Sequence, residues 1–431
     1  MKQLPHVLRL REYESAAIEP RWDVEKKTVP PSVVAELERL QADQRMEFMA
    51  ISRRKIQAQN FVGVVGVGSH AIEILPKTDE ADHATRSRLV EMMSVAGMLP
   101  HLDSGISSLS ASTPCLLDAF MQAYIRQLTV EWRRGRISNY CPVERNRSCL
   151  RGKLQFHDHL RRNRLRPERF FTRADEFQTD VLPSQLLKAA LEVCRRFGTS
   201  ETTRRAAATL LPEFDDVSSH TFADGEPDTV VSDRRIARFD PLLTLAKLFL
   251  KGCVPDRPGA ASTYSLLFDM NTVFERYVGN LLQRVCSPPL RAQLQVSFRS
   301  LVTSEGKPKF RLRPDIAVRR GRRIECLIDT KWKRLDLHQT HQGVRQSDIY
   351  QAYAYAREYD CPAVILLYPR FDQLPAHVAS YRLRTTGALQ PEIRICTVDV
   401  SAAPRDVAKQ LECLLEAVCG QTHPAAVGGR L

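Results

Sequence analysis

The chain has 431 residues, 43% of them hydrophobic, which is enough for two or three domains with buried cores. Lysine and arginine outnumber aspartate and glutamate by 63 to 50, and the net charge of +13 favours a polyanionic partner. No apolar run is long enough for a membrane helix, the N-terminus lacks an apolar signal core, and the eleven cysteines show no paired or metal-ligand spacing. The sequence therefore predicts a soluble cytoplasmic protein with reduced thiols and no membrane segment.

Residues 1–100 predict a mixed α/β domain. Strands are expected at Val7–Tyr13, Phe61–Val67 and Ala71–Leu75, and a helix at Pro31–Ala42. The turn between the last two strands is rich in glycine, but a phosphate-binding P-loop needs a lysine where Ser69 stands. We therefore expect a hairpin there and no nucleotide bound by this chain itself.

Residues 101–260 predict a mostly helical region with a basic stretch. Helices are expected at Leu116–Arg134, Leu186–Phe197 and Pro241–Leu250, with a loop from Asp215 to Asp233 and a linker from Pro255 to Ser262. Between Arg133 and Arg173 there are 13 Lys/Arg against 3 Asp/Glu, interleaved with aromatic residues. Such a stretch is either a solvated basic face or a DNA-binding surface. The candidate DNA contacts are Arg133, Arg134, Arg136, Arg151, Lys153, Arg161 and Arg162.

Residues 261–420 predict a third domain, in which two strands bring acidic residues together. Apolar and polar residues roughly alternate from Leu312 to Val318, Gly321 supplies a turn, and a second strand runs from Ile324 to Lys331. Because side chains alternate along a strand, Asp329 and Lys331 share one face, and Asp315 can lie beside them on the neighbouring strand. The Gly/Ala/Pro-rich tail, residues 421–431, is expected to be disordered.

These residue types suit metal-dependent hydrolysis of a phosphodiester. Asp315 and Asp329 suffice to hold Mg²⁺ (or Mn²⁺) against a phosphate, because this ion keeps several waters. The metal would lower the pKa of a bound water, and Lys331 would position that water or stabilise the pentavalent transition state. The carbonyl of Thr330 is a further candidate ligand. Asp-x-Lys also arises by chance, but here an apolar strand, an upstream Pro-Asp and a following helix accompany it.

A helix and a buried strand follow the two predicted strands. Residues 347–356 have helical spacing, which puts Gln351 and Tyr355 on one face. This Gln-x-x-x-Tyr helix is typical of one branch of the PD-(D/E)xK nucleases, and we favour a functional role for both residues. Upstream, Glu275 lies off the apolar stripe of a predicted helix and is either a metal ligand or a solvated side chain. A buried strand at Ala363–Tyr368 completes the expected core.

Motifs spread over most of the chain carry a family resemblance. They are Leu267–Val278, Arg313–Ile316, Ile328–Lys333 and Asp348–Gln351 in the third domain, Phe61–Gly66 and Ile72–Lys77 near the N-terminus, and Leu150–Leu154 and Asp175–Asp180 between them. Together they resemble the McrC family, the nuclease subunits of McrBC modification-dependent (type IV) restriction systems. Thr330 and Trp332 stand where the family commonly has Ala and Tyr, but neither departure removes a proposed ligand.

The resemblance implies a Mg²⁺-dependent endonuclease that acts with a separate partner in defence against foreign DNA. McrC-like proteins act with McrB, an AAA+ GTPase that forms a hexameric ring. Their N-terminal half docks into the pore of the ring and stimulates GTP hydrolysis, which implies a docking role for residues 1–100. Methylcytosine recognition resides in the partner, so this chain is expected to cut double-stranded, methylated DNA while reading little base sequence.

Two other functions fit part of the sequence. A self-sufficient repair nuclease of the same superfamily would cut DNA with metal alone, and a non-cutting regulatory subunit would dock on an NTPase and bind DNA. The complete set of Asp315, Asp329 and Lys331 disfavours the regulatory subunit. The expected fold is an α/β PD-(D/E)xK core with a mixed sheet flanked by helices, preceded by a mixed N-terminal domain and a mainly helical middle region.

Overall fold

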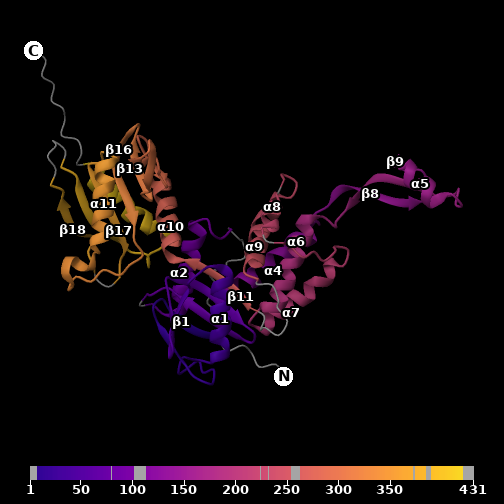
Figure 1. The fold of residues 1–431 in the computed structure, drawn as a ribbon, viewed down its shortest axis with the longest axis horizontal. Coiled ribbons are helices and arrows are strands. Elements are labelled where there is room, and N and C mark those ends of the chain that lie inside the picture. The colour runs from indigo at the N-terminus through magenta and orange to yellow at the C-terminus, as the bar shows by residue number, and fades with distance from the viewer. Residues whose placement is uncertain are drawn as a thin grey trace, which may run out of the picture.

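The chain folds into three parts that lie in a row (Figure 1). The structure, a computed structural model, describes residues 7–78, 80–100, 113–223, 225–231, 233–253, 263–371, 374–384 and 390–420. A slender arm projects at one end of the molecule, a six-stranded sheet with its helices lies at the other, and the N-terminal sheets lie between them. Among the helices in these ranges, none is long and apolar enough to cross a bilayer. The cysteines are free thiols, as expected.

Two four-stranded sheets form the N-terminal part. The larger has the order β1 (Val7–Arg11), β7 (His70–Leu75), β6 (Phe61–Val67) and β11 (Thr263–Asp269), and the smaller β3 (Thr28–Val29), β2 (Ser15–Ile18), β5 (Lys55–Ala58) and β4 (Met49–Ile51). Helix α1 (Pro31–Gln44) packs on one face of the larger sheet and α2 (Asp82–Val95) on the other. The predicted β6–β7 hairpin and the predicted helix α1 are confirmed.

Glycine at position 63 lets two distant segments pair. Strand β11 lies antiparallel to β6, with Leu267 opposite Gly63. Gly63 has a φ of 132°, and a Cβ there would lie 1.9 Å from the carbonyl oxygen of Leu266. Any side chain at this position would therefore push β11 away from β6. Because β11 belongs to the larger N-terminal sheet, the domain boundary predicted at residue 261 falls one strand before the chain leaves that sheet.

The helices of the middle part pack around one apolar core. They are α4 (Leu116–Arg134), α6 (Leu182–Phe197), α7 (Glu201–Leu210), α8 (Glu226–Thr229) and α9 (Asp240–Lys251), with 3-10 turns at Leu211–Phe214 and Ala237–Phe239. The prediction for α4 is confirmed at both ends, and α6 begins four residues before the predicted Leu186. The predicted loop 215–233 holds only α8 in its described part. The predicted linker 255–262 and tail 421–431 lie outside the described residues.

A β-arm interrupts this helical region, and the sequence analysis did not predict it. Strands β8 (Asn139–Arg147) and β10 (Phe170–Gln178) pair antiparallel along their whole length, β9 (Lys153–Leu154) adds to β10, and α5 (Phe156–Asn163) packs against them. We call residues 139–178 the arm; it projects away from the rest of the molecule (Figure 1). Strand β8 is largely exposed on both faces, so its sequence lacks the alternation that marks a half-buried strand.

The C-terminal part is built on one mixed sheet with the order β12-β15-β16-β17-β19-β18. Its elements are α10 (Met270–Val285), β12 (Leu290–Leu294), β13 (Arg299–Ser304), β14 (Lys307–Leu312), β15 (Ile316–Arg320), β16 (Arg323–Thr330), a 3-10 turn (Thr340–Gly343), α11 (Gln346–Glu358), β17 (Ala363–Pro369), β18 (His377–Arg382), β19 (Glu392–Val398) and α12 (Pro404–Cys419). β15 and β16 are antiparallel, whereas β16, β17 and β19 run parallel.

Strand alternation gives this sheet two buried faces. Ile316 and Ile328 point toward α10 and α12, whereas Ala317 and Leu327 point toward α11. The strand predicted from Leu312 to Val318 is broken, since β14 ends at Leu312 and β15 begins at Ile316. Pro314, which has no N–H for a ladder, lies in the break. The break frees Asp315 from the regular sheet.

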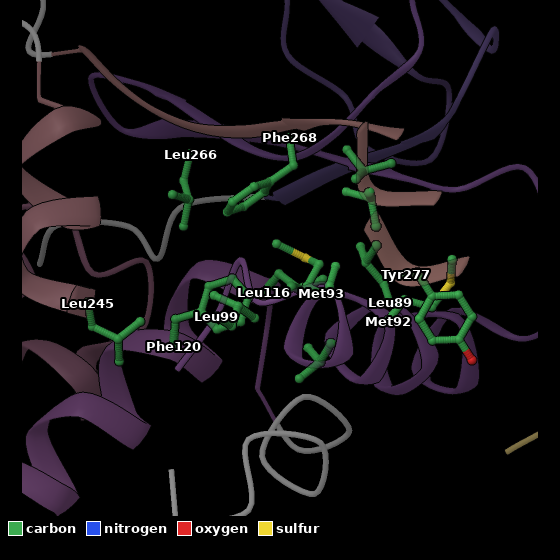
Figure 2. Packing of buried hydrophobic residues seen from close by; sticks show 14 of the residues in the cluster. Leu89, Met92, Met93, Leu99, Leu116, Phe120, Leu245, Leu266, Phe268 and Tyr277 are labelled. Carbon is green, nitrogen blue, oxygen red and sulfur yellow. The ribbon is translucent and has the colours of Figure 1, made fainter. Parts of the chain in front are cut away.

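A continuous hydrophobic core joins the three parts. Figure 2 shows Leu89, Met92 and Met93 of α2 gathered with side chains of α4, α9, β11 and α10, and the same cluster continues through α12 to the inner strands of the C-terminal sheet. Burying a side chain of this size contributes about 1.5–3 kcal/mol relative to leaving it exposed. The relative placement of the parts therefore rests on apolar packing.

A buried carboxylate fastens α2 and α4 to the larger N-terminal sheet. Glu73 of β7 is fully buried and pairs with Arg86 of α2, whose Nε donates to Glu73 Oε1 at 2.9 Å. The backbone N–H of Leu116, at the start of α4, donates to the same oxygen at 2.9 Å. Arg9 Nε of β1 lies 3.4 Å from Glu73 Oε2. One side chain thus ties four elements together.

We expect Glu73→Ala to lower the free energy of unfolding by about 3–5 kcal/mol, because it leaves the guanidinium of Arg86 buried without its partner. Urea unfolding of the purified protein measures the change. The matched control is Glu201→Ala, which removes ion pairs to the exposed Arg205 and the partly exposed Arg204 and should cost about 1 kcal/mol or less. Equal effects of the two substitutions would contradict the structural role of Glu73.

Candidate active site

The candidate site lies where β16 ends beside the break before β15. Asp315 is anchored there by Thr330, whose backbone N–H and Oγ1 each donate to Asp315 Oδ2 at 2.7 Å. The antiparallel register, with Ile316 opposite Ile328, brings Asp315 next to Asp329 and Thr330. Asp315 therefore lies beside the Asp329–Lys331 segment, as the sequence predicted.

Asp329 and Lys331 form a close ion pair in this position. Lys331 Nζ lies 2.5 Å from Asp329 Oδ2, as expected for residues two apart at the end of a strand. Asp329 is 1% exposed. Within the described residues its Oδ2 accepts no hydrogen bond of good geometry, although it is buried. The only partner of this oxygen among the described residues is therefore the Lys331 ammonium, and a bound metal ion could share the carboxylate with it.

Burial and neighbouring carboxylates raise the pKa of both carboxyls. Burial, together with the nearby charge of Glu275, raises the pKa of Asp315 to about 6. Burial, together with the charge of Asp315, raises the pKa of Asp329 to about 6. Burial alone would lower the pKa of Lys331, but the Asp329 carboxylate raises it overall, so the ammonium stays charged. The two carboxylates carry more negative charge than one lysine balances.

Helix α11 holds the lysine from the other side. Lys331 Nζ donates to Gln351 Oε1 at 3.1 Å, and Gln351 Nε2 donates to the Tyr355 hydroxyl at 2.7 Å. The Tyr355 hydroxyl donates to the carbonyl of Arg313 at 3.0 Å. Gln351 and Tyr355 therefore share a helix face, as predicted, and they link Lys331 to the break beside Asp315.

Sequence reasoning missed Asp348 and its partner Lys333. Asp348 is buried at the start of α11, and Lys333 Nζ donates to its Oδ2 at 2.8 Å and its Oδ1 at 3.1 Å. The hydroxyl of Tyr368 on β17 donates to Asp348 Oδ2 at 3.4 Å. This ion pair fastens α11 to the segment that follows Lys331. Both residues lie in motifs that carried the family resemblance, which was the available signal.

A second missed contact joins the site to the N-terminal part. Trp332, the residue after Lys331, donates from Nε1 to Glu12 Oε2 at 2.8 Å. Glu12 follows β1 and also accepts the backbone N–H of Lys77 at 3.2 Å. Burial raises the pKa of Glu12 to about 7, against the opposing effect of the Trp332 hydrogen bond. The position of Trp332, and so of the strand end that bears Lys331, is coupled to the N-terminal sheet.

The donor set fits a hard divalent cation held by two carboxylates. Mg²⁺ is commonly bound by one or two carboxylates plus water and substrate phosphate, and the buried carboxylates of Asp329 and Asp315 lie close enough for the charge of Asp315 to raise the pKa of Asp329. In the ranges described above, no three His, Cys, Asp or Glu side chains form a ready metal cage. Glu275 lies close enough to raise the pKa of Asp315, and its Oε1 accepts from Gln295 Nε2 at 3.2 Å. Ligation by Glu275 and by the Thr330 carbonyl stays a prediction.

The predicted DNA contacts of the middle region do not lie at this site. Arg133, Arg134 and Arg136 pair with Glu213, Glu131 and Asp216, respectively. Arg151, Lys153, Arg161 and Arg162 lie on the arm, at the opposite end of the molecule from the C-terminal sheet (Figure 1). The guanidinium of Arg162 lies 4.5 Å from the ring centroid of Phe171. Contact of these seven basic residues with DNA stays a prediction.

Comparisons with known proteins agree on one family. The family model described as "McrBC 5-methylcytosine restriction system component" matches residues 56–369. A chain of the refined half-complex from the tetradecameric assembly of Thermococcus gammatolerans McrB AAA+ hexamers with bound McrC has a TM-score of 0.73 at 19% identity, covering 95% of this chain and 100% of that chain. A chain of the cryo-EM structure of the Thermococcus gammatolerans McrBC complex has a TM-score of 0.53 at 21% identity, covering 65% and 88%. No curated protein matches.

We expect Asp315→Asn to stabilise the metal-free protein near neutral pH. The pKa of Asp315 is raised in the folded state, so its ionised form costs stability above about pH 6, and that cost falls as protonation sets in at lower pH. Melting curves in EDTA should show the variant more stable by about 1–3 kcal/mol at pH 7.5, with the gap narrowing at pH 5.

The exposed Asp175→Asn is the control for this experiment. It should leave the difference in melting temperature from the wild-type protein small and flat over the same pH range. An Asp315→Asn protein less stable than wild type at every pH would contradict the conclusion that the two buried carboxylates repel each other.

Proposed function

Since the chain belongs to the family of McrBC 5-methylcytosine restriction system components, we propose that it is the Mg²⁺-dependent DNA endonuclease subunit of a McrBC-like system. The observation that carries the proposal is the buried set of Asp315, Asp329 and Lys331 at one end of the C-terminal sheet. Two adjacent carboxylates with raised pKa values and one charged lysine have little value for stability. Their arrangement suits a reaction on a phosphate group.

Each residue of the set has a distinct role in this proposal. Asp315 and Asp329 hold the cation, and the hydrogen bonds from Thr330 keep Asp315 in position. When bound, Mg²⁺ supplies a water of lowered pKa and offsets the negative charge on the phosphate. The ammonium of Lys331 stays protonated because Asp329 is next to it. It therefore stabilises the charge that develops on the phosphate oxygens in the transition state.

Gln351 and Tyr355 act as positioning residues. The amide oxygen of Gln351 accepts a hydrogen bond from Lys331, and its amide nitrogen donates to the Tyr355 hydroxyl. That hydroxyl donates in turn to the Arg313 carbonyl, so the amide of Gln351 is held in one orientation. A lysine side chain has several rotatable bonds, so an anchor of this kind reduces the number of its conformations. The arrangement keeps the ammonium within reach of a phosphate bound by the two carboxylates.

We expect Lys331→Ala to reduce the rate of DNA cleavage by about 100- to 1,000-fold, the usual effect of removing one transition-state stabiliser. Cleavage of a methylated plasmid is measured with Mg²⁺, GTP and the AAA+ partner. Lys409→Ala, an exposed lysine on α12, should cut at the wild-type rate. Equal cleavage by both variants would falsify the catalytic assignment, and wild-type cleavage without partner or GTP would instead indicate an autonomous nuclease.

We further infer that the chain assembles with a hexameric AAA+ GTPase like McrB, and that the arm takes part in docking. Solved chains similar to this one come from assemblies of McrB AAA+ hexamers with McrC. The nine-residue strands β8 and β10 give the arm a length of about 30 Å. A projection of this length is suited to insertion into the pore of a ring.

The surface of the arm supports contact with a protein. Large apolar side chains on it are exposed, namely Tyr140 65%, Leu150 62%, Phe156 66%, Leu160 54%, Leu165 92% and Phe177 65%. Tyr140 and Phe177 pair with ring centroids 5.2 Å apart, yet both remain in solvent. Large exposed apolar groups on a projecting element are a feature of protein interfaces, and binding to phosphates alone does not require them. The arginines among them suit a polar rim.

We expect the double variant Leu160→Asp, Leu165→Asp to weaken stimulation of the partner's GTPase by at least about tenfold, since buried interface anchors each contribute more than about 1 kcal/mol. GTP hydrolysis by the partner is titrated with the purified chain. Val231→Asp changes a side chain of the middle part that is 79% exposed and serves as the control. Unchanged stimulation by the double variant would exclude the arm as a docking element.

A further inference from the structure

A two-stranded ribbon projects from the C-terminal sheet beside the candidate site. Strands β13 and β14 pair only with each other and form no part of the six-stranded sheet. We call Arg299–Leu312 the ribbon. From Leu301 to Arg311 every residue is exposed. An isolated two-stranded ribbon is marginally stable by itself, so its persistence on the surface calls for an explanation.

The ribbon carries positive charge without compensation. Between Phe298 and Arg313 there are five Lys/Arg against one Asp/Glu, which is Glu305 in the turn. Four of the five basic residues, Lys307, Lys309, Arg311 and Arg313, occupy alternate positions along β14 and the segment after it. None of these four forms an ion pair in the part of the chain that the structure describes. The charge is therefore available to a ligand outside the protein.

Exposed apolar groups accompany this charge. Phe310 is 75% exposed and has a φ of 54°, a backbone conformation that a bulky side chain rarely adopts. Phe298 is 54% exposed at the root of the ribbon. Neither burial nor backbone preference explains a phenylalanine at position 310, and strain of this kind persists at sites of binding.

The root of the ribbon is fixed to the same helix that holds Lys331. The hydroxyl of Tyr359, the residue that follows α11, lies within hydrogen-bond distance of the carbonyls of Val296 at 3.3 Å and Leu312 at 3.0 Å, one on each side of the ribbon. One residue beyond Leu312, the Arg313 carbonyl accepts the Tyr355 hydroxyl that contacts Gln351. The ribbon thus leads directly into Asp315 and shares an anchor with the lysine.

We propose that the ribbon is the DNA-holding element of this chain, and that Lys307, Lys309 and Arg311 bind backbone phosphates of a duplex whose scissile phosphate lies at Asp315 and Asp329. The inference rests on the proposed nuclease function. Charge complementarity selects a polyanion, and a two-stranded ribbon fits the major groove of a duplex. The ribbon reads no base sequence through phosphate contacts. It therefore supplies affinity and orientation.

The test compares two double variants of the full-length chain, each lacking one lysine and one arginine. Lys309→Ala with Arg311→Ala removes charge from the ribbon, and Lys409→Ala with Arg405→Ala removes it from the exposed outer helix α12. Binding to a labelled methylated duplex is followed by fluorescence anisotropy in EDTA over a series of KCl concentrations. Cleavage is then measured with Mg²⁺, GTP and the AAA+ partner.

The ribbon variant should bind DNA at least about tenfold more weakly, and the salt slope should fall by about 1.8, which is two phosphate contacts. The α12 variant should match wild type. If wild type cuts DNA and the ribbon variant binds and cuts equally well, the ribbon proposal is overturned while the nuclease function stands. Loss of partner GTPase stimulation with normal DNA binding would also overturn it, in favour of a protein contact. A wild-type chain that neither binds nor cuts DNA would overturn both.

Discussion

The burial of two carboxylates next to each other at the end of an apolar sheet is the constraint on which the rest of the site depends. Asp315 and Asp329 repel each other there, and burial raises the pKa of both. Lys331 offsets part of this charge, and Thr330 supplies two hydrogen bonds to Asp315. The remaining negative charge favours binding of a cation, because an uncompensated buried charge is costly. The proposed metal would neutralise that charge, which gives a functional reason for burying two carboxylates side by side.

The layout of the chain separates this site from the surface proposed for docking. The arm and the C-terminal sheet lie at opposite ends of the molecule, and the continuous core that includes α2, α4, β11 and α10 lies between them (Figures 1 and 2). In addition to this packing, the hydrogen bond from Trp332 to Glu12 is a polar contact between the strand end at Lys331 and the N-terminal sheet. Packed side chains and hydrogen bonds of this kind are contacts through which distant sites of one chain can be coupled.

Much of the site could be predicted from the sequence, because its signals are local. The alternation of side chains along β16 predicted that Asp329 and Lys331 lie on the same face. The four-residue spacing on α11 predicted the same for Gln351 and Tyr355. The remainder depends on pairing between distant segments or on exposed strands. β11 pairs with β6 across a long stretch of sequence, which no local pattern indicates. Strand β8 of the arm lacks a buried face that would impose alternation. The structural role of Asp348 depends on Lys333 and Tyr368, which contact it only in the folded chain.

The most direct test of the central claim is whether phosphodiester hydrolysis requires both the divalent cation and Asp329. Methylated duplex DNA, the partner and GTP are incubated with wild type or Asp329→Asn, in Mg²⁺ or in EDTA, and the product ends are identified. Discrete fragments are expected from wild type with partner and GTP only when Mg²⁺ is present, and no fragments are expected from Asp329→Asn although it still stimulates the partner's GTPase. Cleavage by wild type in EDTA, or equal cleavage by Asp329→Asn in Mg²⁺, would contradict the central claim.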